Sequence, residues 1–247
     1  MHKLARSVHK WLMLFLGVQF VIWSVTGAYM VFFDIDYIHG DTLVNQHQVT
    51  INPQNIDFSL AELIKAYPQA SQISMGKLMN QDVYRFHIEQ GDSTQLVMLS
   101  AQTGERLSAI NQAAAVTLAQ YYYQHSEHQV AEVNYIADNP PFEISPRHLP
   151  VWQIHFDHFS LPTLYVSAQS GLLVGKRHVF WRAFDWMFRF HIMDYSSGEN
   201  IDNKLLFFVA LLSTIGVISG LVLTYFRVFK TGRSKRKTRL VRHQGGM

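Results

Sequence analysis

Cysteine is absent from this 247-residue chain. Its absence excludes disulfides, thiol chemistry, Cys-ligated zinc and iron–sulfur clusters. The chain also lacks a P-loop, G-x-G-x-x-G, H-E-x-x-H and G-x-S-x-G, so it carries no self-contained catalytic signature and leaves enzyme activity open.

Acidic residues are missing from both tails: all 18 lie between Asp34 and Asp202, whereas more than half of the 21 Lys and Arg residues lie outside that block. This sorting predicts that the tails and the middle occupy different compartments.

Charge is also missing from two long apolar runs, 11–33 and 205–226. Each is about 22 residues long, and about 20 residues of helix cross the hydrocarbon core of a bilayer. Both runs therefore predict transmembrane helices. The alternative for the first run is a cleaved signal peptide. Its length and the lack of a small-x-small cleavage site favour an uncleaved anchor.

Lys and Arg flank the two runs on the sides that face the termini. Lys3, Arg6 and Lys10 precede the first run, and a basic cluster from Arg227 to Arg242 follows the second. The positive-inside rule then places both termini in the cytoplasm and the middle block in the periplasm of a bacterial inner membrane. Beside a membrane exit, the basic tail favours anionic lipid. We expect membrane lipid as a partner and no nucleic acid.

The pentapeptide SAQTG at 100–104 returns as SAQSG at 167–171. Aligning the two stretches also pairs further positions upstream: Tyr84 with Trp152, and His87 with His155. A repeat at this spacing is typical of a duplicated structural unit. We expect two units of about 65 residues, each with a helix on one face of an antiparallel sheet.

Local patterns predict the elements of the middle block. Asp57 or Ser59 is a candidate N-cap for the first helix, and period-2 alternation marks the strands. Asp34 and Asp36 are expected to form a solvated collar at the membrane exit. The predicted elements are a short strand and loop over 34–55, a helix over 58–70, strands within 73–79, 82–90 and 94–107, a helix over 111–126, a strand over 132–137, and a hairpin of strands within 151–159 and 163–176.

The predicted fold class is an α+β membrane protein in which two transmembrane helices flank an extracytoplasmic domain of two helix-plus-antiparallel-sheet repeats. The predicted boundaries are a cytoplasmic N-terminus at 1–10, a transmembrane helix at 11–33, repeats at 34–110 and 111–177, an interfacial amphipathic segment at 178–202, a transmembrane helix at 203–226 and a basic cytoplasmic tail at 227–247.

Both apolar runs carry a loose sequence motif. A basic His-x-Trp-x5-Gly pattern and a Thr-Gly pair mark the first run, and two glycines mark the second: His9, Trp11, Gly17, Thr26, Gly27, Gly216 and Gly220. With the helix-and-hairpin pattern between the runs, the chain resembles the PepSY-associated transmembrane family over nearly its whole length. The resemblance implies PepSY-like extracytoplasmic modules. Larger relatives have four or more spans, whereas this chain has two.

The resemblance also implies a cofactor, because some larger relatives resemble haem-bearing inner-membrane reductases of ferric chelates. His9 and His191 are then candidate haem b ligands, since neutral imidazole ligates haem iron. They lie at opposite sides of a core about 30 Å thick, so a single iron cannot bind both. Haem would need two copies of the chain, a partner subunit or other ligands. His178 as a second ligand on the helix of His191 is disfavoured by the intervening charges.

A competing interpretation assigns both histidines to anchoring at the membrane interface. His9 forms a basic-aromatic belt with Lys10 and Trp11. His191 follows alternating aromatic and charged residues, a pattern typical of a helix lying on the bilayer. Composition favours this anchoring role over ligation.

Gly216 and Gly220 form a G-x-x-x-G motif in the second run, which predicts a close-packing helix face. Gly27 of the first run is expected either to meet that face or to leave it free for dimerisation. We therefore expect a homo-oligomer or a membrane partner subunit.

The functional hypothesis is an accessory or haem-binding subunit in envelope redox chemistry or ferric-chelate reduction and uptake, with electrons from a partner. PepSY modules also resemble segments of protease propeptides. The alternatives are accordingly a periplasmic module that holds or inhibits a protease or other envelope protein, or a scaffold subunit of a membrane complex. HSEH at 125–128 is interpreted as a solvated helix end, and no metal site is predicted.

Overall fold

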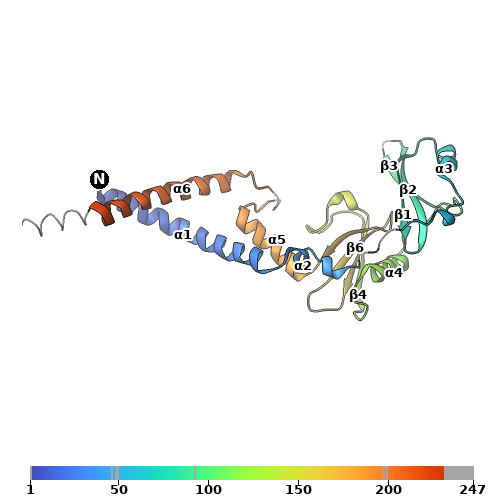
Figure 1. Cartoon of the computed structure of the whole chain (residues 1–247), viewed down its shortest axis with the longest axis horizontal. Helices are drawn as coiled ribbons and strands as arrows, with labels where there is room; N and C mark the ends of the chain where they lie inside the picture. Colours follow the sequence, from blue (N-terminus) through green and yellow to red (C-terminus); the bar gives the residue numbers. More distant parts are fainter. Residues whose placement is uncertain are drawn as a thin grey trace, which may run out of the picture. The chain divides into compact units, whose positions relative to one another are not determined.

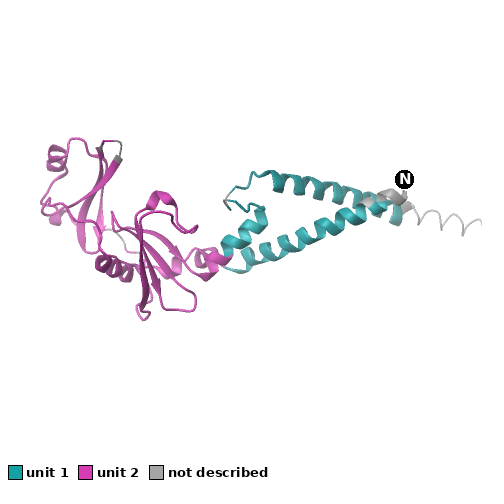
Figure 2. Cartoon of the chain, turned by 180° about the vertical axis from the view of Figure 1, so that it is seen from behind, with its two compact units in different colours: residues 1–33, 184–247 teal, residues 34–183 magenta. Residues whose placement is uncertain are grey.

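The computed structural model of the chain describes residues 2–45, 47, 50–91, 93–196, 198 and 200–230. The predicted basic tail lies outside the described residues from 231 onward. The chain divides into two compact units (Figure 2). We call 1–33 with 184–247 the helix unit and 34–183 the sheet unit.

The helix unit contains α1 (His2–Phe32), most of α5 (Val179–Ile192) and α6 (Lys204–Tyr225), which continues as one turn of π-helix over Phe226–Lys230 (Figure 1). Two stretches, His9–Phe32 and Lys204–Val228, are long and apolar enough to cross a membrane. The Asn203 side chain caps α6 by accepting a hydrogen bond from the Leu206 amide. These helices occupy the two apolar runs of the sequence.

Small and apolar side chains hold α1 against α6. Leu16 of α1 and Val209 of α6 are buried together with Met193. A Cβ built on Gly216 would lie 3.4 Å from Leu16 Cδ1 and 3.2 Å from Met13 Sδ, so the helices approach closely at this glycine. Most other apolar side chains of α1 and α6 are exposed, as expected for surfaces that contact lipid.

The sheet unit begins with α2 (Ile35–Ile38), where the sequence predicted a strand. Asp34 explains the difference, because its carboxylate accepts hydrogen bonds from the amides of Asp36 and Tyr37 and so caps a helix. A 3-10 turn over Asp41–Leu43 follows, and Val44 forms a single bridge with Tyr123.

The first half of the sheet unit is a helix followed by three antiparallel strands. After a 3-10 turn at Pro53–Asn55, α3 (Leu60–Ala66) starts at Ser59, which forms a capping box with Glu62 as the sequence suggested. The strands β1 (Ser71–Leu78), β2 (Gln81–Gln90) and β3 (Ser93–Ser100) pair in that order. Leu63 of α3 packs on their apolar face.

The second half has the same order of elements with one more strand. The helix α4 (Gln112–Tyr122) packs on a sheet with the order β4-β5-β6-β7, formed by Val130–Ile136, Val151–Phe156, Thr163–Ser167 and Leu173–Arg177. A 3-10 turn at Pro146–His148 joins β4 to β5. Leu118 of α4 is buried against Ile154 and Leu164.

The two SAQ-x-G turns make matching hydrogen bonds. The Gly104 amide donates to the Ser100 carbonyl, and the Gly171 amide donates to the Ser167 carbonyl, both at 2.9 Å. Before each helix an amide donates to the alanine of the turn: Phe58 to Ala101 at 3.0 Å, and Ile110 to Ala168 at 2.8 Å. The aligned aromatic residues also match, because Tyr84 Oη donates to the Phe58 carbonyl and Trp152 Nε1 to the Ile110 carbonyl.

Candidate functional site

His9 lies on α1 and faces the hydroxyl of Ser219 on α6. The His9 Nδ1 to Ser219 Oγ distance is 2.8 Å, and Ser219 Oγ also donates to the Gly216 carbonyl at 2.8 Å. A hydroxyl has one proton, and here that proton goes to the carbonyl. With the proton there, His9 Nδ1 is the donor to Ser219. In the neutral imidazole this leaves the lone pair on Nε2.

His191 lies at the end of α5 and is held in the same way by α1. Its Nδ1 lies 2.8 Å from Thr26 Oγ1, which donates its own proton to the Ile22 carbonyl at 2.8 Å. His191 Nδ1 is thus the donor, and its Nε2 carries the lone pair. Trp23 Nε1 donates to the His191 carbonyl at 2.8 Å and fixes this end of α5 on α1.

A glycine lies beside each of these imidazoles. A Cβ built on Gly220 would lie 3.3 Å from His9 Cε1 and 3.8 Å from its Nε2, and one built on Gly27 would lie 3.7 Å from His191 Cε1. Gly220 therefore lies beside the Cε1–Nε2 edge of His9, and Gly27 lies beside Cε1 of His191. Gly27 borders α5, whereas Gly216 and Gly220 border α1, so the three predicted packing glycines do not form one face.

The two histidine sites are separate. Thr26, which holds His191, lies about 25 Å beyond His9 along α1 at 1.5 Å per residue. The apolar cluster of Leu16, Met193 and Val209 lies in the helix pair between these levels. Each site therefore offers one imidazole.

Sequence reasoning missed two polar groups of this unit. Ser219 contacts His9 Nδ1 and so bears on the tautomer of that ring. In the sequence, the only local pattern that could have pointed to Ser219 is its position next to Gly220. Gln19 lies within the first span, and its Nε2 is buried with no hydrogen-bond partner among the described residues, as is Ser213 Oγ of α6. An amide inside an apolar run is itself a signal of function in a membrane helix.

His178 differs from His9 and His191. It is almost fully buried, its Nε2 donates to the Tyr37 carbonyl at 2.9 Å, and its Nδ1 accepts from the Phe180 amide at 3.3 Å. Burial lowers the pKa of this imidazole, and carbonyl hydrogen bonds only partly oppose the effect. Both ring nitrogens are used within the protein, so neither is left for a ligand.

The HSEH stretch at 125–128 follows α4. His125 Nδ1 and His128 Nε2 lie 3.5 and 3.6 Å from one carboxylate oxygen of Glu127, and the His128 ring stacks on His158 at 4.4 Å. Among the described residues, no group of three His, Asp or Glu side chains is placed to hold a metal ion.

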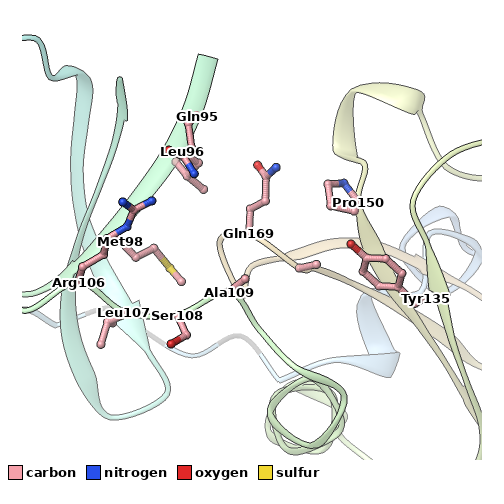
Figure 3. A pocket seen from close by; sticks show the side chains of 11 residues that line it. Gln95, Leu96, Met98, Arg106, Leu107, Ser108, Ala109, Tyr135, Pro150 and Gln169 are labelled. Atoms are coloured by element: carbon pink, nitrogen blue, oxygen red, sulfur yellow. The ribbon is translucent and has the colours of Figure 1, made fainter. Parts of the chain in front are cut away.

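The sheet unit also contains a cleft of about 580 Å³ beside β3 (Figure 3). Leu96 of β3, Tyr135 of β4 and Gln169 of the second SAQ-x-G turn line it. β3 and β4 are each the edge strand of a sheet, so part of their backbone is not paired within a sheet. Among the described residues that line the cleft, Arg106 is the only charged one.

Comparison with known families gives a match over nearly the whole chain. The family model described as the PepSY-associated TM region matches residues 6–244. The chain belongs to the PepSY-associated TM family. This confirms the resemblance seen in the sequence and agrees with two helices able to span a membrane. Comparisons of this PepSY-associated TM chain with curated proteins and with solved structures gave no significant match.

Proposed function

We propose that this PepSY-associated membrane protein is a haem-binding, electron-transfer subunit in which His9 and His191 would hold haem b. The observation that carries the proposal is the shared state of the two imidazoles. Each donates from Nδ1 to a hydroxyl whose own proton is already engaged, and each keeps an Nε2 lone pair.

The residues around both histidines fit a haem ligand. Metal-ligating histidines usually donate their other ring N–H to a fixed acceptor, which sets the tautomer and the ring orientation. Ser219 and Thr26 are such acceptors, and Gly220 and Gly27 leave space beside the rings. Bound haem b would supply one-electron redox chemistry. The chain's own residues orient the imidazoles through Nδ1, and apolar side chains fill the helix unit between the two sites.

The proposed setting is the bacterial inner membrane, with both termini cytoplasmic and the sheet unit periplasmic. The distribution of Lys and Arg around the two spans supports this orientation. The chain contains no flavin or nicotinamide signature, so electrons would come from a partner. Reduction of a ferric chelate outside the membrane is the reaction class that the family resemblance implies.

We also propose that the sheet unit consists of two copies of one PepSY-like module, 34–110 and 111–177. The matched hydrogen bonds of the two SAQ-x-G turns support this duplication, as does the same order of helix and strands. Each glycine of the turns has a positive φ, +72° at Gly104 and +67° at Gly171, which a residue with a side chain rarely adopts.

Absorption spectroscopy tests the haem assignment. The full-length protein purified from haem-replete cells should show a Soret band and, after dithionite, the narrow bands of a b-type cytochrome. His9→Ala and His191→Ala should each reduce the haem content, whereas His47→Ala, on an exposed loop of the sheet unit, should not. A protein that stays free of haem at full haem supply would contradict the assignment.

The cleft beside β3 favours a second candidate function, the binding of an envelope protein such as a protease. An exposed edge strand can pair with an extended segment of a partner, and Arg106 would select a segment with a carboxylate. A photo-crosslinker at Gln95 of the full chain in its native membrane should then form one adduct that Arg106→Glu removes and Arg147→Glu keeps. An adduct that ignores Arg106 would speak against this function.

A further inference from the structure

We infer that the cleft beside β3 binds the C-terminal end of an extended polypeptide, which pairs with the open edge of β3 and places its terminal carboxylate at Arg106. The inference rests on the second candidate function, the binding of an envelope protein, and is independent of haem. It adds the chemistry of the bound segment, which is a free chain end rather than an internal stretch.

The four edge strands of the two sheets differ in how they are protected. Natural sheets block their edges with bulges, charged side chains or proline. The strands β1, β4 and β7 each pair with a register shift, and they carry Lys77, Glu132 and Lys176 respectively. In contrast, β3 pairs with β2 without a shift over its whole length and contains neither a charge nor a proline. Among the described strands, the edge of β3 is thus the one left open to a further strand.

Backbone hydrogen bonds show which groups of β3 point toward this edge. The Ala101 amide donates to the Asp82 carbonyl at 2.9 Å, so the odd-numbered residues of β3 bond to β2 and the even-numbered ones face the edge. Met98 agrees, because its carbonyl accepts from the Leu107 amide at 2.9 Å. The outward amide and carbonyl of Leu96 have no hydrogen-bond partner among the described residues. They are the donor and acceptor that an added strand would use.

The segment 105–107 closes one end of this edge. It lies beside the last residues of β3, where Leu99 forms a bridge with Arg106. The chain then continues along the wall of the cleft at 107–109. A strand added beside residues 93–97 would meet this segment end-on, so it would have to stop or turn there. A chain end fits that position without a turn.

The charge of the cleft selects which chain end is bound. Arg106 is exposed, and it is the only charged residue among the described residues that line the cleft. A guanidinium pairs with a carboxylate through two parallel hydrogen bonds and repels an ammonium group. The bound end is therefore the C-terminus. With its carboxylate at the closed end of the edge, the added segment runs parallel to β3.

Apolar side chains line the cleft on both sides of this path. Leu96 and Met98 come from β3, and Tyr135 and Pro150 lie across the cleft from them (Figure 3). Successive side chains of a strand point to opposite faces, so every second residue of the added segment would enter the cleft. The ligand class is thus an extended C-terminal peptide with apolar residues at alternate positions.

Peptide capture by the full-length protein in lipid nanodiscs tests the inference. The probe is an equimolar pool of octapeptides built from valine, isoleucine, leucine, threonine and serine, prepared with a free C-terminal carboxylate and, separately, as the C-terminal amide. Because a hydrogen bond to a charged group changes affinity by about tenfold to a hundredfold, the free-carboxylate pool should be retained at least about tenfold better. Arg106→Gln should remove this difference, and Arg147→Gln, exposed on the turn at 146–148, should keep it.

N-methylation along one retained peptide tests the pairing with β3. Methyl groups on alternate amides should abolish binding, whereas methyl groups on the amides between them should leave it unchanged, because only every second amide faces β3. A peptide held by its carboxylate alone would not show this period of two. Loss at every position, or at none, would overturn the pairing.

The remaining outcomes separate this inference from the function on which it rests. Equal retention of the two pools would overturn the chain end and leave an internal segment as the bound partner. Retention of neither pool, with a photo-crosslinked adduct at Gln95 in the native membrane, would overturn the inference and keep the binding of an envelope protein. Neither retention nor an adduct would overturn both. Hydrogen exchange of β2 and β3 in Arg106→Gln should match the wild type, so that its loss of binding is not a loss of fold.

Discussion

The two units of the chain treat their polar groups differently. In the sheet unit Glu143 accepts hydrogen bonds from Arg182 at 2.7 and 2.8 Å and from Tyr165 Oη at 2.5 Å, so both carboxylate oxygens are satisfied. In the helix unit His9 and His191 each hydrogen-bond a hydroxyl through Nδ1, and their Nε2 atoms make no hydrogen bond among the described residues. The first network is closed within the fold, whereas the histidine pair leaves an acceptor atom open at each ring, which is the basis of the proposed ligand role.

Asp82 is the exception in the sheet unit. Its carboxylate oxygens are buried with no hydrogen-bond partner among the described residues, and Lys77 Nζ lies 3.7 Å away. This ion pair is looser than that of Glu143 with Arg182. Glu143, rather than Asp82, therefore represents the fully hydrogen-bonded polar groups of the sheet unit. We expect its substitution to have the largest effect on stability.

Glu143→Gln should break the network most severely. Removal of one partner of a buried ion pair costs about 3–5 kcal/mol, because it leaves the other charge unpaired. We expect the free energy of unfolding to fall by an amount near the lower end of this range, since Arg182 is partly exposed. Hydrogen exchange of β5 and β6 peptides in the full chain measures it, with the exposed Glu132→Gln as the control. Hydrogen-exchange protection in Glu143→Gln equal to that of the wild type would contradict a structural role for Glu143.

The same carboxylate predicts a pH dependence. Burial acts to raise the pKa of Glu143, but hydrogen bonds from Arg182 and Tyr165 outweigh it, so the pKa lies below the ordinary value of 4.5. A depressed carboxyl pKa contributes stability that is present above the unfolded value and is lost as the pH falls through the folded value. Below about pH 4.5, wild type should lose more protection at β6 than Glu143→Gln does.

Gly171→Ala should have the next largest effect. A Cβ there would lie 2.4 Å from Leu78 Cδ1, and the residue has a φ of +67°. The left-handed backbone costs about 1–2 kcal/mol for a residue with a Cβ, and overpacking adds about 1–3 kcal/mol. Gly91→Ala isolates the backbone cost, because Gly91 has a φ of +63° and no atom within 4 Å. Equal unfolding midpoints for the two variants would mean that the contact with Leu78 costs nothing.

Ser219→Ala and Thr26→Val test the hydroxyls that hold the two histidines of the helix unit. Loss of the group that orients a metal-ligating histidine typically lowers affinity by about 10–100-fold. We expect that loss in haem titrations of both variants, with the fold intact. Ser24→Ala and Thr214→Val are matched controls, because their hydroxyls bond only to carbonyls of their own helices. Wild-type affinity in Ser219→Ala and Thr26→Val would show that the hydroxyls do not set the tautomer.

Gly220→Ala should have the smallest effect. Its Cβ would lie 3.3 Å from His9 Cε1, a distance that requires a small shift, so we expect less than about a tenfold loss of haem affinity at that site. Gly27→Ala, with 3.7 Å to His191, and Gly17→Ala, with no atom within 4 Å, should bind haem as the wild type does. A larger loss in Gly27→Ala than in Gly220→Ala would reverse this order.

Local sequence patterns were enough for much of the fold. Apolar length placed both spanning helices, and the Ser59 capping box marked α3. The first residues of the sheet unit were predicted wrongly as a strand, since the cap supplied by Asp34 outweighs the alternation that follows it.

The sequence could not predict how the residues of the candidate site are arranged. His9 and Ser219 are 210 residues apart, and Thr26 and His191 are 165 apart, so no local pattern links them. The sequence singled out His9 and His191 but could not show that a hydroxyl lies within hydrogen-bond distance of each one. It also could not show that Gly27 borders α5 rather than the glycines of α6.

The central claim is that His9 and His191 keep Nε2 for a haem iron. Solid-state nitrogen NMR of the full chain, labelled at histidine and held in lipid, tests it most directly when spectra without and with haem are compared. Of the 13 histidines, two should be Nδ1–H tautomers whose Nε2 signals vanish on haem binding, and His9→Ala and His191→Ala should assign one each. Nε2–H tautomers at these two residues, or Nε2 signals that persist with haem bound, would contradict the claim.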